Sequence, residues 1–461
     1  MSRKLAAADL SGAPSRGLSR RLAVGAALSA LLAGCVGYKA APLATDPTPF
    51  PGEDELKAAA ARLKSTRLRP VAIDLSRPLT PDELALIAVI ASPELKAARA
   101  KAGVADAQAF QAGLLPDPTF SIGFDKPYAG PDDVTALSSA LGFDLSSLTS
   151  RHLVKKAADA AAEQAHLDLA WQEWQTSGQA RLLAARVVWL QAQGALADKA
   201  RTAADDMLTR TLRATARGDL KADDLEPRRI AAAEAADRAR NSEKELAAAR
   251  SDLNKLLGLA PDIRLALAAP SAPAEPADPA RLFQTAKTGR LDLAALRSGY
   301  ASEDAKLRQA ILEQYPKLNL TVNHARDTAG VKSIGAAIDF TLPLWNRNRG
   351  AIAVENATRA QLRAEYDQRL SDTRADIAAL VENIVILRRQ RAEIDAQVRP
   401  LRMLAEATEA AAKRGDLADS VADSARQSVT DKEIALAALD QSLAEQDVTL
   451  ELAVGTLRET W

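Results

Sequence analysis

The chain has 461 residues, of which 47% are hydrophobic but only 4% are aromatic, so its apolar surface is mostly alanine and leucine. Small apolar side chains combined with 26% charged residues favour long helices with charged outer faces over a thick globular core. The 60 basic and 60 acidic side chains balance, and no basic block is present that could neutralise phosphates, which argues against nucleic-acid binding.

Residues 1–34 are predicted to be a secretion signal that is cleaved before Cys35, the only cysteine of the chain. Two adjacent arginines precede an apolar run over 22–32 that is too short to span a bilayer, and Leu-Ala-Gly comes directly before the thiol. This pattern resembles bacterial lipoprotein signals, which implies acylation of Cys35 and a stable lipid anchor. Val36 stands where an aspartate would imply retention at the inner membrane. A signal peptide without lipidation is the alternative.

The rest of the chain contains an internal repeat of roughly two hundred residues. Residues 94–99 align with 292–297, and at the same shift Pro118 aligns with Pro316. The sequence Arg-Gly-Asp-Leu, which starts at Arg217, recurs 197 positions later. Alanine-rich helices alone would not keep glycine and proline at a nearly constant offset. We therefore divide the chain into a signal peptide (1–34), an N-terminal extended segment with a short helix (35–91), a first repeat (92–260), a linker (261–289) and a second repeat (290–461).

Two predicted strands follow a helix in each repeat, and these helices cover about 92–115 and 290–314. Along the strands, apolar residues alternate with polar or small ones, as in a sheet whose two faces meet different surroundings. The stretches have the ~10-residue length of a tilted transmembrane strand, although a soluble sheet would alternate in the same way. The apolar set that we expect to face lipid comprises Phe120, Ile122, Phe124, Leu141, Phe143, Leu318, Leu320, Val322, Ile338 and Phe340.

Strands are the predicted means of membrane crossing, because no segment after the signal has the ~20 uninterrupted apolar residues of a transmembrane helix. Four strands from one chain leave open sheet edges. In lipid, each unpaired backbone group at such an edge costs several kcal/mol. If the strands span the membrane, several chains must therefore share one closed sheet.

A very long helix is predicted after each strand pair, over about 151–216 and 349–413. At ~1.5 Å per residue each is on the order of 100 Å long, and apolar residues recur along it at steps of three and four, as in a coiled coil. Pro400 is expected to kink the second helix. Gly218 and Gly415 should end the two helices, since glycine adopts a positive φ easily. The return helices that follow cover about 221–257 and 418–457.

Taken in order, these features resemble the TolC-like outer-membrane efflux channels of the lipoprotein type. Residues 113–118 before the first strand, 340–347 after the fourth, the helix ends at Gly258 and Gly455 and the two Arg-Gly-Asp-Leu tips carry the resemblance. It implies a mainly α fold with a small membrane contribution from strands. In that fold three chains share one 12-strand β-barrel, continued by a 12-helix periplasmic α-barrel.

The resemblance also implies a homotrimer in the Gram-negative outer membrane, extending into the periplasm. The expected partners are a periplasmic adaptor (membrane fusion) protein, which docks at the helical tips, and an inner-membrane pump. The family often has an acidic residue six positions after the turn glycine; Asp224 fits this pattern and Val421 departs from it. The tip residues that match are Gly218, Asp219, Leu220, Asp224, Gly415, Asp416 and Leu417.

Three tip carboxylates are candidates for an anionic ring at the periplasmic entrance. Asp416, Asp419 and Asp423 are spaced by three and four residues, which would place them on one helical face. Symmetry would multiply each charge and favour cations. An acidic helix start favoured by the helix macrodipole is the alternative explanation.

A passive conduit is the function that these features predict, with drug or heavy-metal efflux favoured over type I protein secretion. A lipid-anchored periplasmic coiled-coil scaffold without a pore is the alternative. No enzymatic activity is expected, since no catalytic constellation or phosphate loop is present. No cofactor is expected beyond the covalent lipid on Cys35, and His152, His166 and His324 lack the spacing of metal ligands.

Overall fold

The computed structural model describes residues 38–46, 49–63, 68–69, 71–270, 275 and 278–460. The chain divides into two units, Met1–Pro49 and Phe50–Trp461, and the second contains both repeats. The predicted signal peptide and Cys35 lie outside the described residues. Within the described ranges, none of the helices combines the length and the apolar character that a bilayer span requires.

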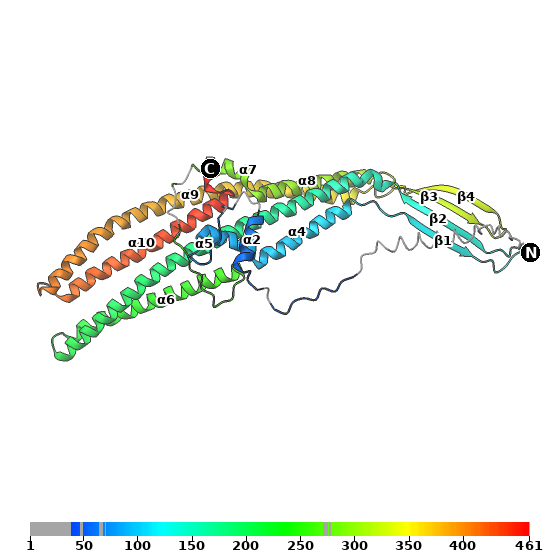
Figure 1. Cartoon of the computed structure of the whole chain (residues 1–461). Helices are drawn as coiled ribbons and strands as arrows, with labels where there is room; N and C mark the ends of the chain where they lie inside the picture. The colour runs from blue at the N-terminus through cyan, green and yellow to red at the C-terminus, as the bar shows by residue number, and fades with distance from the viewer. Residues whose placement is uncertain are drawn as a thin grey trace, which may run out of the picture. The chain divides into compact units, whose positions relative to one another are not determined.

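The second unit repeats one order of elements: a helix, two strands, a very long helix and a return helix (Figure 1). Before and within the first repeat lie α2 (Glu53–Arg62), α3 (Pro81–Ala91), α4 (Pro93–Ala112), β1 (Thr119–Asp125), β2 (Ala136–Asp144), α5 (Ser146–Arg217), the 3-10 helix η1 (Ala222–Asp224) and α6 (Leu225–Leu257). Then follow α7 (Pro279–Gly289), α8 (Leu291–Leu312), β3 (Leu318–Arg326), β4 (Lys332–Phe340), α9 (Arg349–Lys413), α10 (Asp419–Val454) and the 3-10 helix η2 (Arg458–Thr460). The predicted duplication is therefore confirmed.

Local chemistry explains where several of these elements begin and end. Helix α3 starts with a capping box in which Thr80 and Glu83 bond each other's backbone N–H groups, and Pro81 occupies its first turn. Helix α5 begins five residues before the predicted start, because a carboxylate oxygen of Asp144 accepts hydrogen bonds from the N–H groups of Ser146 and Ser147. Helix α9 runs on through Pro400 without a break.

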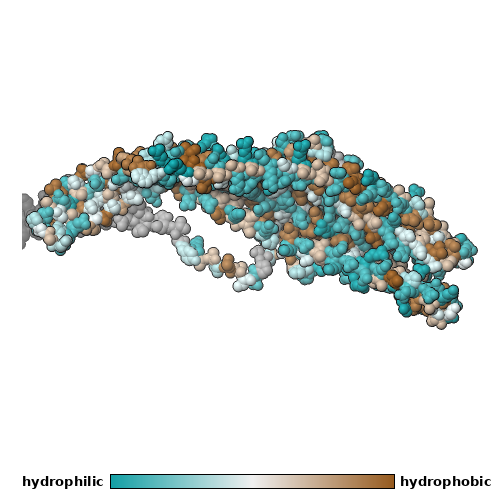
Figure 2. All heavy atoms as spheres, turned by 180° about the vertical axis from the view of Figure 1, so that it is seen from behind, coloured by the Kyte–Doolittle hydropathy of each residue, from teal (hydrophilic) through white to brown (hydrophobic). Residues whose placement is uncertain are grey.

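The helices pack around α5, which contacts α3, α4, α6, α8 and α10. One core cluster joins α2, α3, α5 and α6 and includes the buried Leu84 and Leu183. A second cluster joins α7, α9 and α10 and includes the buried Leu282 and Ile377. On the face seen in Figure 2, hydrophilic residues cover much of the helical part, with hydrophobic patches between them.

The segments outside the repeats are part of this packing. The predicted linker 261–289 carries α7, and it returns to the start of the unit, where Leu79 and Leu267 form a parallel bridge. The N–H of Leu79 donates to the carbonyl of Ala266 over 2.9 Å, and the N–H of Ala268 donates back over 2.8 Å. The described part of 35–91 holds two helices, α2 and α3. Both segments therefore brace the middle of the long helices.

The four strands form one antiparallel sheet in the order β1-β2-β3-β4. The two hairpins come from different repeats and meet where β2 pairs with β3 (Figure 1). Helices α4, α5, α8 and α9 all adjoin one end of the sheet, and the strand-connecting loops 126–135 and 327–331 close the other end.

Candidate functional site

One register joins all four strands and collects the predicted apolar residues on a single face of the sheet. Phe120 lies opposite Leu141, Leu141 opposite Val322, and Val322 opposite Ala336. Because side chains alternate along a strand, every second residue from these positions shares the same face. That apolar face holds Phe120, Ile122, Phe124, Leu141, Phe143, Leu318, Leu320, Val322, Ile338 and Phe340.

The described helices leave this apolar face uncovered. Phe120 is 69% exposed, Ile338 62% and Phe340 55%. No strand residue belongs to any of the three hydrophobic clusters found among the described residues. A contiguous apolar surface of this kind marks contact with a membrane or another protein.

The two faces of the sheet also differ in the sign of their charges. Within the four strands, the polar face carries Asp125, Asp144 and Asp339 and no basic residue. The apolar face carries Arg326 and Lys332, both at the loop end, and no acidic residue. Small and hydroxyl side chains fill most of the remaining polar face. The sheet is therefore two-sided in charge as well as in hydropathy.

The sheet has two unpaired edges, because β1 and β4 each have a neighbouring strand on one side only. Each edge presents backbone N–H and C=O groups that require partners in a lipid environment. Strands from other copies of the chain can provide these partners, since successive strands alternate in direction.

At the far ends of the long helices, the two repeats build the same turn. Gly218 has φ +85° and Gly415 has φ +81°, the left-handed conformation predicted for both. The N–H of Asp219 donates to the carbonyl of Ala214 over 2.9 Å. In the second repeat, the N–H of Asp416 donates to the carbonyl five residues before it over 3.0 Å. Both helices thus end in a Schellman-type turn.

The side chains at the two tips also match. Arg217 Nε donates to Asp219 Oδ2 over 2.9 Å, and Arg414 Nε donates to Asp416 Oδ2 over 2.8 Å. The leucine that follows each of these aspartates is part-exposed, Leu220 at 42% and the corresponding leucine of the second tip at 41%. Each tip therefore presents an apolar side chain beside a charge-compensated turn.

Comparison with solved structures decides what this arrangement resembles. No protein-family model matches the chain, and no curated protein matches it in sequence. The channel-forming protein CusC matches with a TM-score of 0.68 at 16% identity, covering 82% of this chain and 92% of CusC. The outer-membrane channel OprN matches with a TM-score of 0.67 at 16% identity, covering 91% and 99%. The Campylobacter jejuni outer-membrane channel CmeC matches with a TM-score of 0.67 at 14% identity, covering 90% and 94%.

This chain has a TolC-like fold. The likeness covers both repeats and agrees with the element order predicted from the sequence. Within the TolC-like fold, the tips carry the predicted docking residues and the sheet carries the predicted membrane residues.

The acidic residues at the tips of this TolC-like chain have partners that the sequence did not predict. Asp423 is only 13% exposed and accepts hydrogen bonds from Arg210 of α5, at 3.2 Å, and from Arg426. Asp224 accepts a hydrogen bond from the N–H of Lys221 over 3.1 Å and so caps the 3-10 helix η1, which precedes α6. At the second tip, Val421 has no carboxylate for this role, consistent with the departure noted in the sequence.

Two buried charge clusters hold the TolC-like helices together at mid-length. In the first, Arg181 of α5 pairs with Glu451 of α10, and both side chains are at most 6% exposed. Arg69 reaches the same glutamate over 3.4 Å, and Arg181 lies 5.7 Å from the ring centroid of Trp174. The cluster therefore joins the N-terminal segment to helices of both repeats.

The second cluster surrounds Asp292, whose side chain is 6% exposed. Arg290 forms a bidentate pair with it at 3.0 and 2.7 Å, and Arg369 of α9 donates over 2.9 Å. Burial alone would raise the pKa of Asp292, but the hydrogen bonds and charges of the two arginines outweigh it, so the pKa is lowered. Arg290 also lies 4.8 Å from the ring centroid of Trp171.

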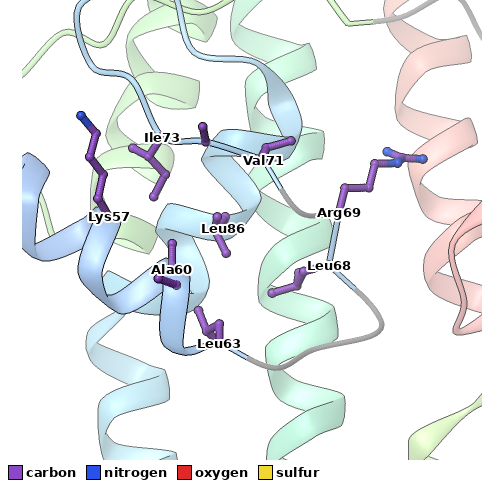
Figure 3. Close-up of a pocket in the computed structure, with 10 residues that line it drawn as sticks. Lys57, Ala60, Leu63, Leu68, Arg69, Val71, Ile73 and Leu86 are labelled. Atoms are coloured by element: carbon purple, nitrogen blue, oxygen red, sulfur yellow. The ribbon is translucent and has the colours of Figure 1, made fainter.

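A cavity of about 450 Å³ lies between α2, α3 and the segment that joins them (Figure 3). Its two cations already have partners, since Lys57 pairs with Glu53 over 2.6 Å and Arg69 with Asp82 over 2.8 Å. The rest of its lining is mainly apolar and includes Ala60, Leu63, Leu68, Val71, Ile73 and Leu86. Across the described residues, no group of His, Cys, Asp and Glu side chains is arranged to hold a metal ion.

Proposed function

We propose that this chain is the outer-membrane channel subunit of a tripartite export system. Three copies would form a passive conduit for solutes delivered by an inner-membrane pump through a periplasmic adaptor. The observation that carries this proposal is the four-stranded sheet, which has an uncovered apolar face, a polar face and two open edges. The names of OprN and CmeC as outer-membrane channels support it.

The sheet has the properties that a shared transmembrane wall requires. Its apolar face would contact lipid, and its polar face would line the conduit. Edge-to-edge pairing between copies would satisfy the backbone groups of β1 and β4. The trimeric stoichiometry comes from the sequence resemblance and is part of the proposal.

The helical tips are proposed to bind the adaptor. The contact residues would include Gly218, Asp219, Leu220 and Asp224 of the first tip, and Gly415, Asp416 and Leu417 of the second. Exposed leucines beside compensated ion pairs suit a helical partner, because apolar contact can form there without burying an unpaired charge. The energy for export would come from the pump.

Anchoring by a lipid on Cys35 after signal cleavage is proposed from the sequence pattern. It would fix the chain to the outer membrane in addition to its strands. Drug or heavy-metal efflux is favoured over protein secretion as the transported class. No enzymatic activity is proposed.

Single-channel recording of the purified full-length protein tests the proposal. We expect a heat-resistant trimer in detergent and steady conductance in planar bilayers. Two neighbouring substitutions in β3 give a matched comparison: Val322→Lys places a charge on the apolar face, and Asn323→Lys places it on the polar face. The first should abolish or strongly reduce insertion, since a lipid-facing lysine near the midplane costs about 2–4 kcal/mol. The second should insert and change ion selectivity.

The scaffold alternative predicts different results. A monomer in aqueous buffer that never conducts would favour a periplasmic coiled-coil scaffold. Equal effects of Val322→Lys and Asn323→Lys on insertion would also contradict the assignment of the apolar face to lipid.

A further inference from the structure

The apolar face of the sheet ends in basic residues at the loop end. In the last row of the register, Phe124 lies opposite Leu137, Leu137 opposite Arg326, and Arg326 opposite Lys332. Two cations are therefore direct cross-strand neighbours on one face. Like charges in this position destabilise a sheet unless an anion lies between them.

No carboxylate of the described chain neutralises this pair. Neither Arg326 nor Lys332 takes part in a salt bridge with any described residue, and Arg326 donates only to the backbone carbonyl of Thr135, over 2.9 Å. The Nε of Arg326 is buried and has no hydrogen-bond partner in the described part of the chain. The guanidinium of Arg326 therefore has a backbone carbonyl as its acceptor and no counter-charge within the described part of the chain.

The nearby carboxylates are engaged elsewhere or lie on the other face. Asp125 lies on the polar face, opposite Ala136. Asp132 accepts a hydrogen bond from Thr328 over 2.8 Å, and Asp327 accepts one from the N–H of Val331 over 2.8 Å. Asp133, in the loop between β1 and β2, forms no salt bridge with the pair. The charge of Arg326 and Lys332 is thus left for an external anion.

We propose that Arg326 and Lys332 bind the phosphate of an acylated, phosphorylated glycolipid in the outer leaflet of the membrane. The next row of this face, towards the helices, holds Ile122, Ser139, His324 and Ile334, and the row after it is apolar, with Phe120, Leu141 and Val322. Acyl chains would lie along these residues, and the headgroup phosphate would reach the guanidinium and ammonium groups.

The position of Arg326 and Lys332 in the sheet indicates which leaflet of the membrane they would contact. All helices that adjoin the sheet do so at the end opposite the loops 126–135 and 327–331. If the helices extend into the periplasm, as the proposed function states, the basic row lies at the outer surface. The inference therefore rests on the proposed function and specifies the lipid that the apolar face contacts.

The test compares thermal stability of the full-length oligomer in two vesicle types, phosphatidylcholine alone and phosphatidylcholine with lipid A. Lipid A should raise the melting temperature of the wild type. In the double variant Arg326→Gln and Lys332→Gln this increase should be lost, together with most of the lipid phosphate that co-purifies with the protein. The matched control is Lys199→Gln with Lys244→Gln, which removes the same charge from exposed helical positions and should keep the increase.

Three results would overturn the inference: an undiminished shift in the double variant, the same shift with dephosphorylated lipid A, or the same shift with inorganic phosphate alone. The last would identify a general anion site. Conductance measured on the same preparations separates the two proposals. If the protein conducts but shows no dependence on lipid phosphate, only the lipid inference fails; if it neither inserts nor conducts, the channel proposal fails.

Discussion

At the scale of single residues, the buried carboxylate of Asp292 links stability to pH. Its pKa is lowered from the ordinary value of 3.8 by Arg290 and Arg369, against the opposing effect of burial. A carboxylate with a lowered folded-state pKa stabilises the fold above its unfolded-state pKa. That contribution is lost as the pH falls through the lowered value.

We therefore predict that Asp292→Asn destabilises the protein at neutral pH and that the difference from the wild type shrinks in acid. Urea unfolding midpoints between about pH 7 and pH 3 measure this. The exposed Asp262→Asn serves as the control and should change neither the midpoint nor its pH dependence appreciably. A destabilisation by Asp292→Asn that is equal at both ends of the pH range would contradict the assignment.

The sequence predicts single residues well where the cause is local. A glycine at the end of a helix predicts a positive φ, and both Gly218 and Gly415 have a positive φ in the structure. The sequence alone could not predict that Arg210 binds Asp423, or that Arg181 binds Glu451, which lies 270 residues later in the chain. Spacing along a helix identifies neighbours only on the same helix, and these pairs join different helices.

At the scale of elements, glycines show where the long helices approach closely. A Cβ atom at Gly178 of α5 would lie within 2.5 Å of the Cγ of Leu452 on α10. At Gly103 of α4, by contrast, an added Cβ would meet no atom within 4 Å. The same substitution should therefore have opposite effects at the two positions.

Gly178→Ala is expected to destabilise the protein by about 1–3 kcal/mol, because the crossing of α5 and α10 must open. Gly103→Ala is expected to stabilise it by about 0.5–1 kcal/mol through helix propensity alone. The free energy of unfolding of each variant, from urea titration of the full chain in detergent, measures both. A gain in stability at Gly178 would show that the helices are not packed as closely as described.

Element order and strand faces were predictable because they depend on periodicity. Alternation along each strand was enough to assign Phe120 and Val322 to one face, and the register brings them together. The N-terminal helices were less predictable: α2 has no counterpart in the second repeat, and α3, which lies 198 residues before its counterpart α7, falls outside the predicted bounds of the first repeat. The bridge of Leu79 with Leu267 depends on a contact between distant segments, which periodicity cannot reveal.

At the scale of the whole molecule, the predicted acidic ring can be tested in the channel assembly that we propose. Asp416 and Asp423 already pair with arginines of the same chain. Asp419, in the first turn of α10, has no salt bridge to any described residue. We therefore expect Asp419 to contribute most of any cation preference.

Replacing Asp416, Asp419 and Asp423 together by asparagine should lower cation selectivity, and Asp419→Asn alone should produce most of the change. Reversal potentials in asymmetric salt across a planar bilayer measure it. Unchanged selectivity in the triple variant would contradict the ring and favour the alternative, in which the carboxylates only stabilise the start of the helix.

The two edge strands, β1 and β4, come from different repeats and run in opposite directions. Copies that are inserted in the same direction and pair edge to edge as antiparallel neighbours would therefore join the first repeat of one subunit to the second repeat of the next, and every junction would be the same heterologous contact. Such contacts close into a ring only when the copies are related by cyclic rotation. One subunit with a damaged β4 would accordingly leave a gap that no neighbour can fill, so a defective copy would act dominantly in a mixed population.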